Sequence, residues 1–295
     1  MAQATPLLVL GEALVDEFHD GSVAGGAPFN VARSLAALGT PVRFVSRIGA
    51  DDAAGRLVLD SAARFGLAVD DVQRDLQRPT GRVSVHETEG SHRFEIHADA
   101  AWDHLAPPVT VVRGIAYFGS LAQRHPVSRA AMRAVLKTFA GPRLLDLNLR
   151  PGTDTPALAA ESLMLADWVK INEDELRQLQ AWFEPTLAGL MARFALHRLV
   201  LTRGEAGYAL YGDQGRLLAS GAGAAQPAFV DSVGAGDSFT AMLLAGLSLG
   251  RDLAATLALA NRYAAMVCGV RGPLPADPAA LASWRAELHA LATQA

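Results

Sequence analysis

The chain contains a single cysteine, Cys268, which excludes an internal disulfide. It lies in the apolar run 263–270 without a cluster of metal-ligating residues, so we expect a buried, unreactive thiol. No apolar run approaches the roughly 20 residues that cross a bilayer, and residues 7–10 are too short a run for a secretion signal. These absences predict a cytoplasmic protein.

The chain also lacks an excess of positive charge. It has 26 basic and 30 acidic residues, a net charge of −4, which favours neither nucleic acid nor an anionic membrane as a partner. Small molecules are therefore the expected partners. Of the basic residues only Lys137 and Lys170 are lysines, so phosphate recognition is expected to rely on arginine, backbone N–H groups or metal.

Two common nucleotide-binding motifs are missing. Neither lysine follows a glycine-rich loop, which excludes a Walker A kinase. The first apolar run ends in Gly11-Glu12 rather than in G-x-G-x-x-G, which disfavours a dinucleotide-dependent oxidoreductase.

What the chain does contain is an alternation of two patterns along 295 residues, 51% of them hydrophobic. Short apolar runs are typical of buried strands, and the segments between them have helical spacing, which predicts a mostly parallel sheet with helices on both faces. The expected strands are 7–10, 42–48, 115–118, 144–147, 168–171 and 199–201. The expected helices are 30–38, 53–65, 128–139, 173–183, 185–194, 237–249, 253–270 and 279–292.

Residues 12–24 and 80–97 interrupt this alternation. Their polar and apolar residues alternate with period two, and 82–86 and 92–96 are joined by a turn-like segment at 89–91, which predicts a half-exposed hairpin. We interpret these pieces as a small β layer that forms a lid over a cleft. The expected organisation is a single domain over 1–295, with the lid formed by about 12–24 and 80–103.

The strongest local signal is the segment from Asp231 to Phe239, which runs directly into a helix. Gly234 and Gly236 let backbone N–H groups converge, and the start of a helix attracts an anion, so this segment favours an oxyanion or a phosphoryl group. Asp237 at the helix start is either an N-cap or a catalytic carboxylate.

A second glycine motif, Ala24-Gly25-Gly26-Ala27-Pro28-Phe29-Asn30, joins the lid to the core. Adjacent glycines suit a hinge or a close approach to a ligand. Asn30 is either a residue near a helix N-cap or a ligand contact.

Together these segments resemble the ribokinase-like, or PfkB, family of carbohydrate kinases, in order over nearly the whole chain. The motifs that carry the resemblance are Gly11-Glu12 with Asp16, Gly25-Gly26 with Asn30, Leu38-Gly39, Ile48-Gly49-Ala50-Asp51, Asp146-Leu147-Asn148-Leu149-Arg150, Asn172 with Glu175, Thr202-Arg203-Gly204 with Gly207, and 231–237. The resemblance implies a three-layer α/β sandwich with a small β lid, and ATP-dependent phosphorylation of a sugar hydroxyl with Mg²⁺.

The resemblance also implies roles for the residues of the glycine motif near the C-terminal helices. Asp237 corresponds to the catalytic base, and the N–H groups of Gly234, Ala235 and Gly236 correspond to the anion hole. This agrees with what phosphoryl transfer requires, namely positioning and charge neutralisation.

On the nucleotide side, Asn172 and Glu175 match an N-x-x-E element that places phosphates and, through water, Mg²⁺. Without the resemblance, the same residues are simply the acidic first turn of a helix. Thr202, Gly204 and Gly207 match the nucleotide-binding loop. The adenine-side residue Asn261 is a weaker match, because a polar residue on an apolar helix can also face solvent.

On the sugar side, Asp16 matches an acidic residue that accepts hydrogen bonds from hydroxyl groups, with Gly25, Gly26 and Asn30 beside it. Arg150 is expected to point toward phosphates or substrate. Asp231 and the carbonyl of Val233 match a monovalent-cation site, which implies K⁺ as a further cofactor. Lids of this family often pair, so a homodimer through the lid is also expected.

The glycine pair followed by proline most resembles the bacterial fructokinase branch, so fructose is the first choice of substrate. Ile96-His97 replaces the Tyr-Arg pair of relatives, which removes a partner for a sugar-acid carboxylate. His97, Asp99 and Trp102 are either specificity residues or lid-surface residues.

Other substrates stay open. A ribose or ketodeoxygluconate kinase fits the same motifs, and an adenosine kinase would use Phe18, Phe29 and Trp102 as an aromatic clamp. A sugar phosphate would need Arg82, His92 and Arg93. A non-catalytic sugar-binding protein of this fold is the alternative from another class, and it would have little need of Asp237.

Overall fold

The computed structural model describes residues 4–19, 21–88, 91–109, 113–150, 155–225 and 228–293, with the backbone alone at 86–88 and 91–94. Within these ranges nine strands form one large sheet in the order β13-β12-β11-β10-β9-β8-β1-β4-β5. Every pair from β11 to β5 is parallel, whereas β12 and β13 add an antiparallel edge. The predicted mostly parallel sheet is therefore confirmed.

The strands of this sheet are β1 (Leu7–Leu10), β4 (Val42–Gly49), β5 (Val72–Asp75), β8 (Ile115–Gly119), β9 (Arg143–Asp146), β10 (Trp168–Asn172), β11 (Arg198–Thr202), β12 (Tyr208–Tyr211) and β13 (Leu217–Gly221). The helices are α1 (Ala27–Ala37), α2 (Ala53–Arg64), α3 (Pro126–Thr138), α4 (Pro156–Leu163), α5 (Glu173–Trp182), α6 (Leu187–Arg193), α7 (Ala235–Ser248), α8 (Leu253–Val267) and α9 (Ala282–Ala290).

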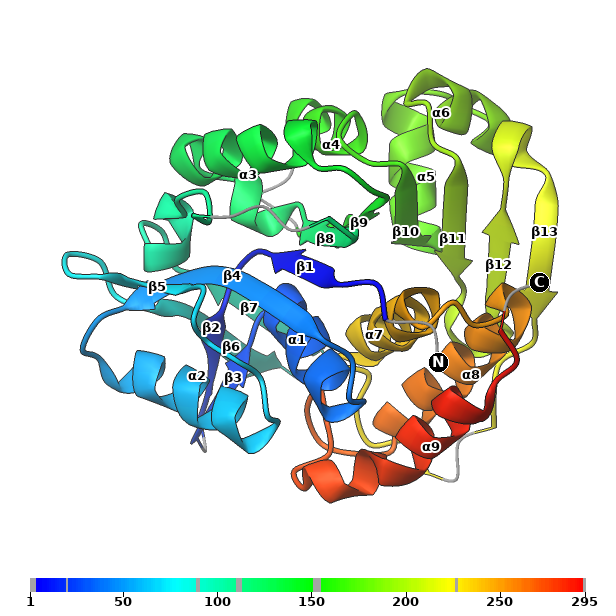
Figure 1. Cartoon of the computed structure of the whole chain (residues 1–295). Coiled ribbons are helices and arrows are strands. Elements are labelled where there is room, and N and C mark those ends of the chain that lie inside the picture. The colour runs from blue at the N-terminus through cyan, green and yellow to red at the C-terminus, as the bar shows by residue number, and fades with distance from the viewer. Residues whose placement is uncertain are drawn as a thin grey trace.

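Helices cover both faces of the sheet and bury a separate core on each. Figure 1 shows α3 to α6 on one side of the sheet and α1, α2 and α7 to α9 on the other. Strand β1 illustrates the division, because Leu7 and Val9 pack in the core under α1 and α7 while Leu8 and Leu10 pack in the core under α3 and α4. A strand buried on both faces has to be continuously apolar, which is why the sequence of β1 shows no alternation.

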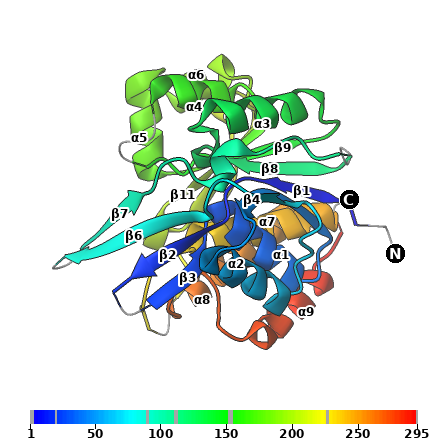
Figure 2. The same cartoon turned by 90° about the vertical axis from the view of Figure 1, so that its left-hand side faces the viewer.

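A second, small sheet stands beside the large one. It consists of β2 (Leu14–Phe18), β3 (Gly21–Gly25), β6 (Gly81–Thr88) and β7 (Ser91–Ile96), in the order β3-β2-β6-β7. Figure 2 shows these strands extending from the body of the molecule. Strands β6 and β7 form the predicted hairpin, although the turn at Glu89 and Gly90 lies outside the described residues.

The segment predicted to form the lid, about 80–103, extends beyond the small sheet. Its last strand ends at Ile96, and the following residues return to the body, where Trp102 is fully buried against the backbone of Gly81. Residues 100–103 therefore belong to the packed core rather than to the surface of a lid, whereas 98 and 99 are exposed.

Four elements were missed by the sequence analysis. Strands β5, β12 and β13 and helix α4 lie in segments whose short or mixed patterns predicted neither strand nor helix. No helix in the described part of the chain has the length and apolar composition of a membrane span.

Candidate active site

A cleft of about 620 Å³ opens at the carboxyl ends of the parallel strands. Its floor includes Glu12 after β1, Asn148 after β9, Lys170 on β10 and Thr202 on β11, and one end is closed by residues of the small sheet. The chain leaves β1 toward β4 and β5 and later crosses back to β8 on the other side of β1. Ligands of open α/β sheets bind at such a switch in strand order.

The N-terminus of α7 forms one wall of this cleft. Gly234 precedes the helix with φ 76°, and a Cβ there would overlap Pro273, so both conformation and space require glycine. The N–H of Ala235 donates to the Ser232 carbonyl at 3.2 Å, whereas those of Gly234 and Gly236 have no acceptor among the described residues. Two of the three predicted anion-hole N–H groups are thus available to a ligand.

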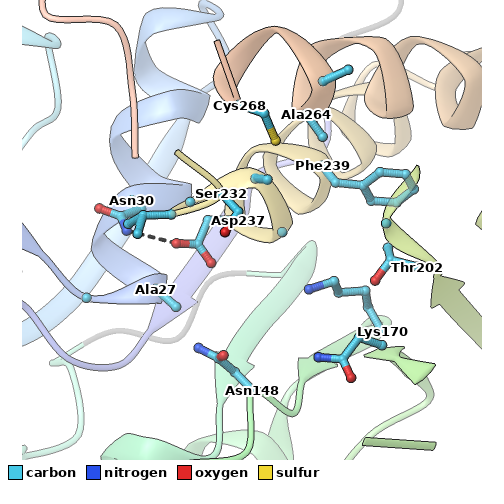
Figure 3. Close-up of a pocket in the computed structure, with 18 of the residues that line it drawn as sticks. Ala27, Asn30, Asn148, Lys170, Thr202, Ser232, Asp237, Phe239, Ala264 and Cys268 are labelled. Carbon is cyan, nitrogen blue, oxygen red and sulfur yellow. Dashed lines mark hydrogen bonds between the residues drawn. The ribbon is translucent and has the colours of Figure 1, made fainter. Parts of the chain in front are cut away.

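Asp237 is the third residue of α7, not its N-cap, so the capping alternative is wrong. Its Oδ2 accepts a hydrogen bond from Asn30 Nδ2 at 2.8 Å, as Figure 3 shows. Burial raises the pKa of Asp237 to about 6, assisted by the nearby Asp146 and opposed by Asn30, Lys170 and Arg150. Asp237 is therefore ionised at neutral pH and is a strong enough base to accept a proton.

The glycine pair and Asn30 lie on the opposite wall. Helix α1 begins at Ala27, three residues before its predicted start, so Asn30 is a buried first-turn residue rather than a cap. A Cβ on Gly25 would overlap the carboxylate of Asp16, so this glycine makes room for a neighbouring side chain. Gly26, Asn30 and Asp16 all line the cleft.

Three carboxyl groups meet at this end of the cleft: Glu12, Asp16 and Asp237. Burial raises the pKa of Asp16 to about 6, opposed mainly by Arg150. Burial raises the pKa of Glu12 to about 8, and its Oε2 has no hydrogen-bond partner in the described structure. The sequence analysis noted Glu12 only as part of a motif, because burial of a carboxyl group leaves no local sequence signal.

Lys170 was not expected at this site. Its Nζ lies 3.0 and 3.1 Å from the two carboxylate oxygens of Asp146, and a Cβ on Gly236 would lie 2.9 Å from it. Figure 3 shows Lys170 and Thr202 entering the cavity opposite Asp237. The sequence predicts phosphate recognition by arginine, backbone N–H groups or metal, whereas the structure places a lysine beside the start of α7.

The Asp146–Lys170 pair is almost fully buried. Burial disfavours the charged form of Lys170, but Asp146, Glu175 and Asp237 more than offset this and raise its pKa, so it carries a positive charge. Thr240 also donates to Asp146 Oδ2 at 3.1 Å. The available signal was a lysine in the middle of a short buried strand, between the apolar residues Val169 and Ile171.

The predicted nucleotide-loop residues Thr202, Gly204 and Gly207 all line the other end of the cleft. Asn261 lines it too, half-buried, with its Nδ2 donating to the Ala222 carbonyl at 2.8 Å, and its role as an adenine-side contact stays a prediction. Cys268 is buried as predicted and also forms part of this wall.

Asn172 and Glu175 form a capping box at the start of α5. Asn172 Oδ1 accepts the Glu175 N–H at 2.8 Å, and the Glu175 carboxylate accepts the N–H groups of Asn172 and Leu149, each at 2.8 Å. Asn172 lines the cleft, whereas the buried Glu175 is not among its lining residues. The geometry is thus that of the first turn of a helix, which was the alternative to a ligand-binding role. The Mg²⁺ role of Glu175 stays a prediction.

The remaining predicted ligands lie at the rim. Arg150 is exposed and lines the cleft, close enough to Asp16 and Asp237 to influence their pKa values. Asp231 Oδ1 accepts the Val233 N–H at 3.0 Å, and its Oδ2 accepts the Gly272 N–H at 3.3 Å. The predicted monovalent-cation site thus lies on an ordered turn before α7.

The expected specificity residues are placed differently from the prediction. His97 does not line the cleft, since its Nε2 lies 2.8 Å from Ser84 Oγ, and its neighbour Ile96 lines the cleft instead. Asp99 is exposed, with its carboxylate bound to Arg78 and His104.

The aromatic clamp predicted for a nucleoside is also largely absent from the site. Phe29 and Trp102 are fully buried in the two cores, so of the three predicted aromatic residues only Phe18 is partly exposed. Arg82 was predicted to bind the phosphate of a sugar phosphate, and its NH1 lies 3.5 Å from Glu17 Oε1. The side chains of His92 and Arg93 lie outside the described structure.

A model of the "pfkB family carbohydrate kinase" matches residues 7–280 of this chain. The chain belongs to the PfkB family of carbohydrate kinases. Among curated relatives, the fructokinase of Klebsiella pneumoniae is 32% identical and the alignment covers 92% of this chain and 95% of that protein. The fructokinase of Escherichia coli is 28% identical with the same coverage.

Two solved kinase structures have the same fold. A double mutant of fructokinase from Vibrio cholerae O395, bound to fructose, ADP and potassium ion, aligns with a TM-score of 0.82 at 25% identity over 96% of this chain and 99% of that chain. Aminoimidazole riboside kinase from Salmonella enterica, with aminoimidazole riboside and an ATP analog, aligns with a TM-score of 0.81 at 26% identity over 95% and 99%. The chain is thus an ATP-dependent sugar kinase with a ribokinase-like fold.

Proposed function

We propose that this PfkB kinase transfers the γ-phosphoryl group of ATP to a hydroxyl of a neutral sugar, with fructose as the first candidate. The observation that carries the proposal is the position of Asp237, whose carboxylate faces the cleft beside the open N–H groups of α7 while Asn30 holds one of its oxygens. A base and an anion-binding helix start thus meet at one point.

The acidic end of the cleft supports a neutral polyol as substrate. Glu12, Asp16 and Asn30 offer hydrogen-bond acceptors and donors for hydroxyl groups, whereas an anionic sugar would meet two further carboxyl groups beside Asp237. Arg150 is the basic residue of this rim. The fructokinase relatives agree with this choice.

In the proposed reaction, Asp237 Oδ1 accepts the proton of the sugar hydroxyl as that oxygen bonds to the γ-phosphorus. The bond from phosphorus to the bridging oxygen breaks, and its electron pair leaves with ADP. Charge on the transferring group is matched by Lys170, the N–H groups of Gly234 and Gly236, and the helix start.

The nucleotide is proposed to lie along Thr202, Gly204, Gly207 and Asn261, which line the cleft from the base of α7 outward. Mg²⁺, when bound, would neutralise phosphate charge, and because it keeps much of its hydration shell it would need few direct protein ligands. Glu175 would act on it through water, and the Asp231 turn with the Val233 carbonyl would hold K⁺. The homodimer through the small sheet remains a prediction.

The test is ADP release from Mg·ATP by the purified protein with fructose, ribose, ketodeoxygluconate, fructose 1-phosphate, adenosine and aminoimidazole riboside. We expect saturable turnover with fructose, which Asp237→Ala lowers by ~10²-fold or more while ATP binding persists. Turnover with another of these acceptors would replace fructose as the substrate. Turnover that survives in Asp237→Ala would contradict the assigned base, and ATP binding without turnover on any acceptor would favour the sugar-binding alternative.

A further inference from the structure

Arg33 on α1 is a buried arginine, with 4% of its surface exposed, that does not line the cleft. Its NH1 donates to Ser61 Oγ at 2.6 Å, and its NH2 donates to the Ala24 carbonyl at 3.0 Å and to Asn30 Oδ1 at 2.5 Å. A buried guanidinium without a carboxylate hydrogen-bond partner is costly. Such a residue has to be explained by what its contacts hold in place.

The contact with Asn30 fixes the orientation of an amide. An arginine has donors only, so the Asn30 oxygen faces Arg33 and the Asn30 nitrogen faces Asp237, where it donates to Oδ2 at 2.8 Å. An ionised carboxylate only accepts, so each of the two contacts of the Asn30 amide pairs a donor with an acceptor. If the Asn30 amide were flipped, its oxygen would face the carboxylate of Asp237 and its NH₂ group would face the guanidinium of Arg33. Neither contact would then pair a donor with an acceptor.

We propose that Arg33 is a positioning residue for Asp237, acting through Asn30: it fixes the Asn30 amide so that Oδ2 of the carboxylate is bound and Oδ1 is left to accept the sugar proton. This inference rests on the proposed role of Asp237 as the base. Arg33 itself is held from two directions, by Ser61 on α2 and by the Ala24 carbonyl on β3, so the small sheet takes part in orienting the base.

Loss of Arg33 leaves the Asn30 amide free to turn its oxygen toward Asp237. Two acceptors then repel unless Asp237 is protonated, so the pH below which turnover falls shifts upward. The other charged or titratable groups that face Asp237 remain in place in such a variant; they are Glu12, Asp16, Tyr117, Asp146, Arg150 and Lys170. The shift can therefore be attributed to the Arg33 change.

Arg33 also carries a charge that acts directly on Asp237, so the test has to separate charge from orientation. Steady-state kinetics with the acceptor that gives turnover are measured for Arg33→Met, Asn30→Ala and the double variant. Orientation through Asn30 predicts that Arg33→Met lowers kcat by ~10-fold or more, on the scale of losses from misplaced catalytic groups, with KM for ATP unchanged. It also predicts that the double variant is no slower than Asn30→Ala alone.

Ser61→Ala is the matched control, because it removes the other side-chain partner of Arg33 and leaves the Asn30 contact intact. Ser61→Ala is expected to keep the wild-type kcat and the wild-type fall in turnover on the acidic side of the pH–rate profile. Thermal unfolding establishes whether each variant is folded. If Arg33→Met is not folded, Arg33→Lys, which retains the charge, takes the place of Arg33→Met in the double-mutant cycle.

The outcomes are distinct. Losses that multiply in the double variant would mean that Arg33 acts by charge alone and would overturn the proposal, as would wild-type kinetics of Arg33→Met. An equal loss in Ser61→Ala would assign a merely structural role to Arg33. Failure of the proposed function itself is recognised separately, because Asp237→Ala would then retain turnover.

Discussion

Replacing Lys170 with Met tests whether the buried ion pair behind the cleft exists in solution. The change keeps most of the apolar stem but removes the ammonium group that lies 3.0 Å from Asp146. The side chains of Lys170 and Asp146 are only 9% and 2% exposed, so the carboxylate of Asp146 would stay largely desolvated without its partner. Asp146 would retain the Thr240 hydroxyl as a hydrogen-bond donor.

Breaking a buried pair by removing one partner costs about 3–5 kcal/mol of unfolding free energy, because the other charge remains buried. In a chain of this size that corresponds to a fall in Tm of roughly 5–8 °C. Asp146→Asn on top of Lys170→Met removes the stranded charge and keeps an acceptor for Thr240. The double variant is therefore expected to recover most of the loss.

The assay is thermal and denaturant unfolding of the two single variants and the double variant without nucleotide, analysed as a double-mutant cycle. Arg56→Met is the control, because Arg56 and Asp51 form a pair at 3.0 Å with side chains 62% and 93% exposed. Exposed pairs contribute less than about 1 kcal/mol. If Lys170→Met changed stability no more than this control, the inference that Asp146 and Lys170 are paired in a dry interior would be refuted.

Three further predictions concern the acidic end of the cleft. Because the pKa of Asp237 is raised to about 6, turnover should fall as pH drops through about 6, and a pH–rate profile flat to pH 4.5 would contradict its role. The folded protein keeps the Glu12 proton up to about pH 8, whereas the unfolded chain loses it near 4.5, so stability falls as pH rises between these values. Glu12→Gln should flatten that slope in Tm measured from pH 5 to 8, and an unchanged slope would place the titration elsewhere. Ile96→Ala should raise KM for the sugar but not for ATP, whereas His97→Ala should have the smaller effect, and the reverse order would restore His97 as the specificity residue.

Much of the architecture followed from the sequence because buried parallel strands and the helices between them have distinct apolar patterns. The continuous run at 7–10 and the alternation in the hairpin at 82–96 were both placed correctly. Strands β12 and β13 were missed, since short antiparallel edge strands depend on pairing with β11 rather than on a pattern of their own. The predicted helix starts were two or three residues off at α1, α3, α6, α7 and α9, and at α1 and α7 glycine rather than a polar side chain precedes the helix.

The sequence by itself located the candidate site residues that form a local motif, as around Asp237 and at the glycine pair before Asn30. Only the tertiary structure decided which distant side chains meet there. Asn30 and Asp237 are 207 residues apart along the chain, and Lys170 reaches the start of α7 only because β10 ends beneath it. It also decided the raised pKa values of Glu12, Asp16 and Asp237, because desolvation depends on what covers a carboxyl group and not on its neighbours in sequence.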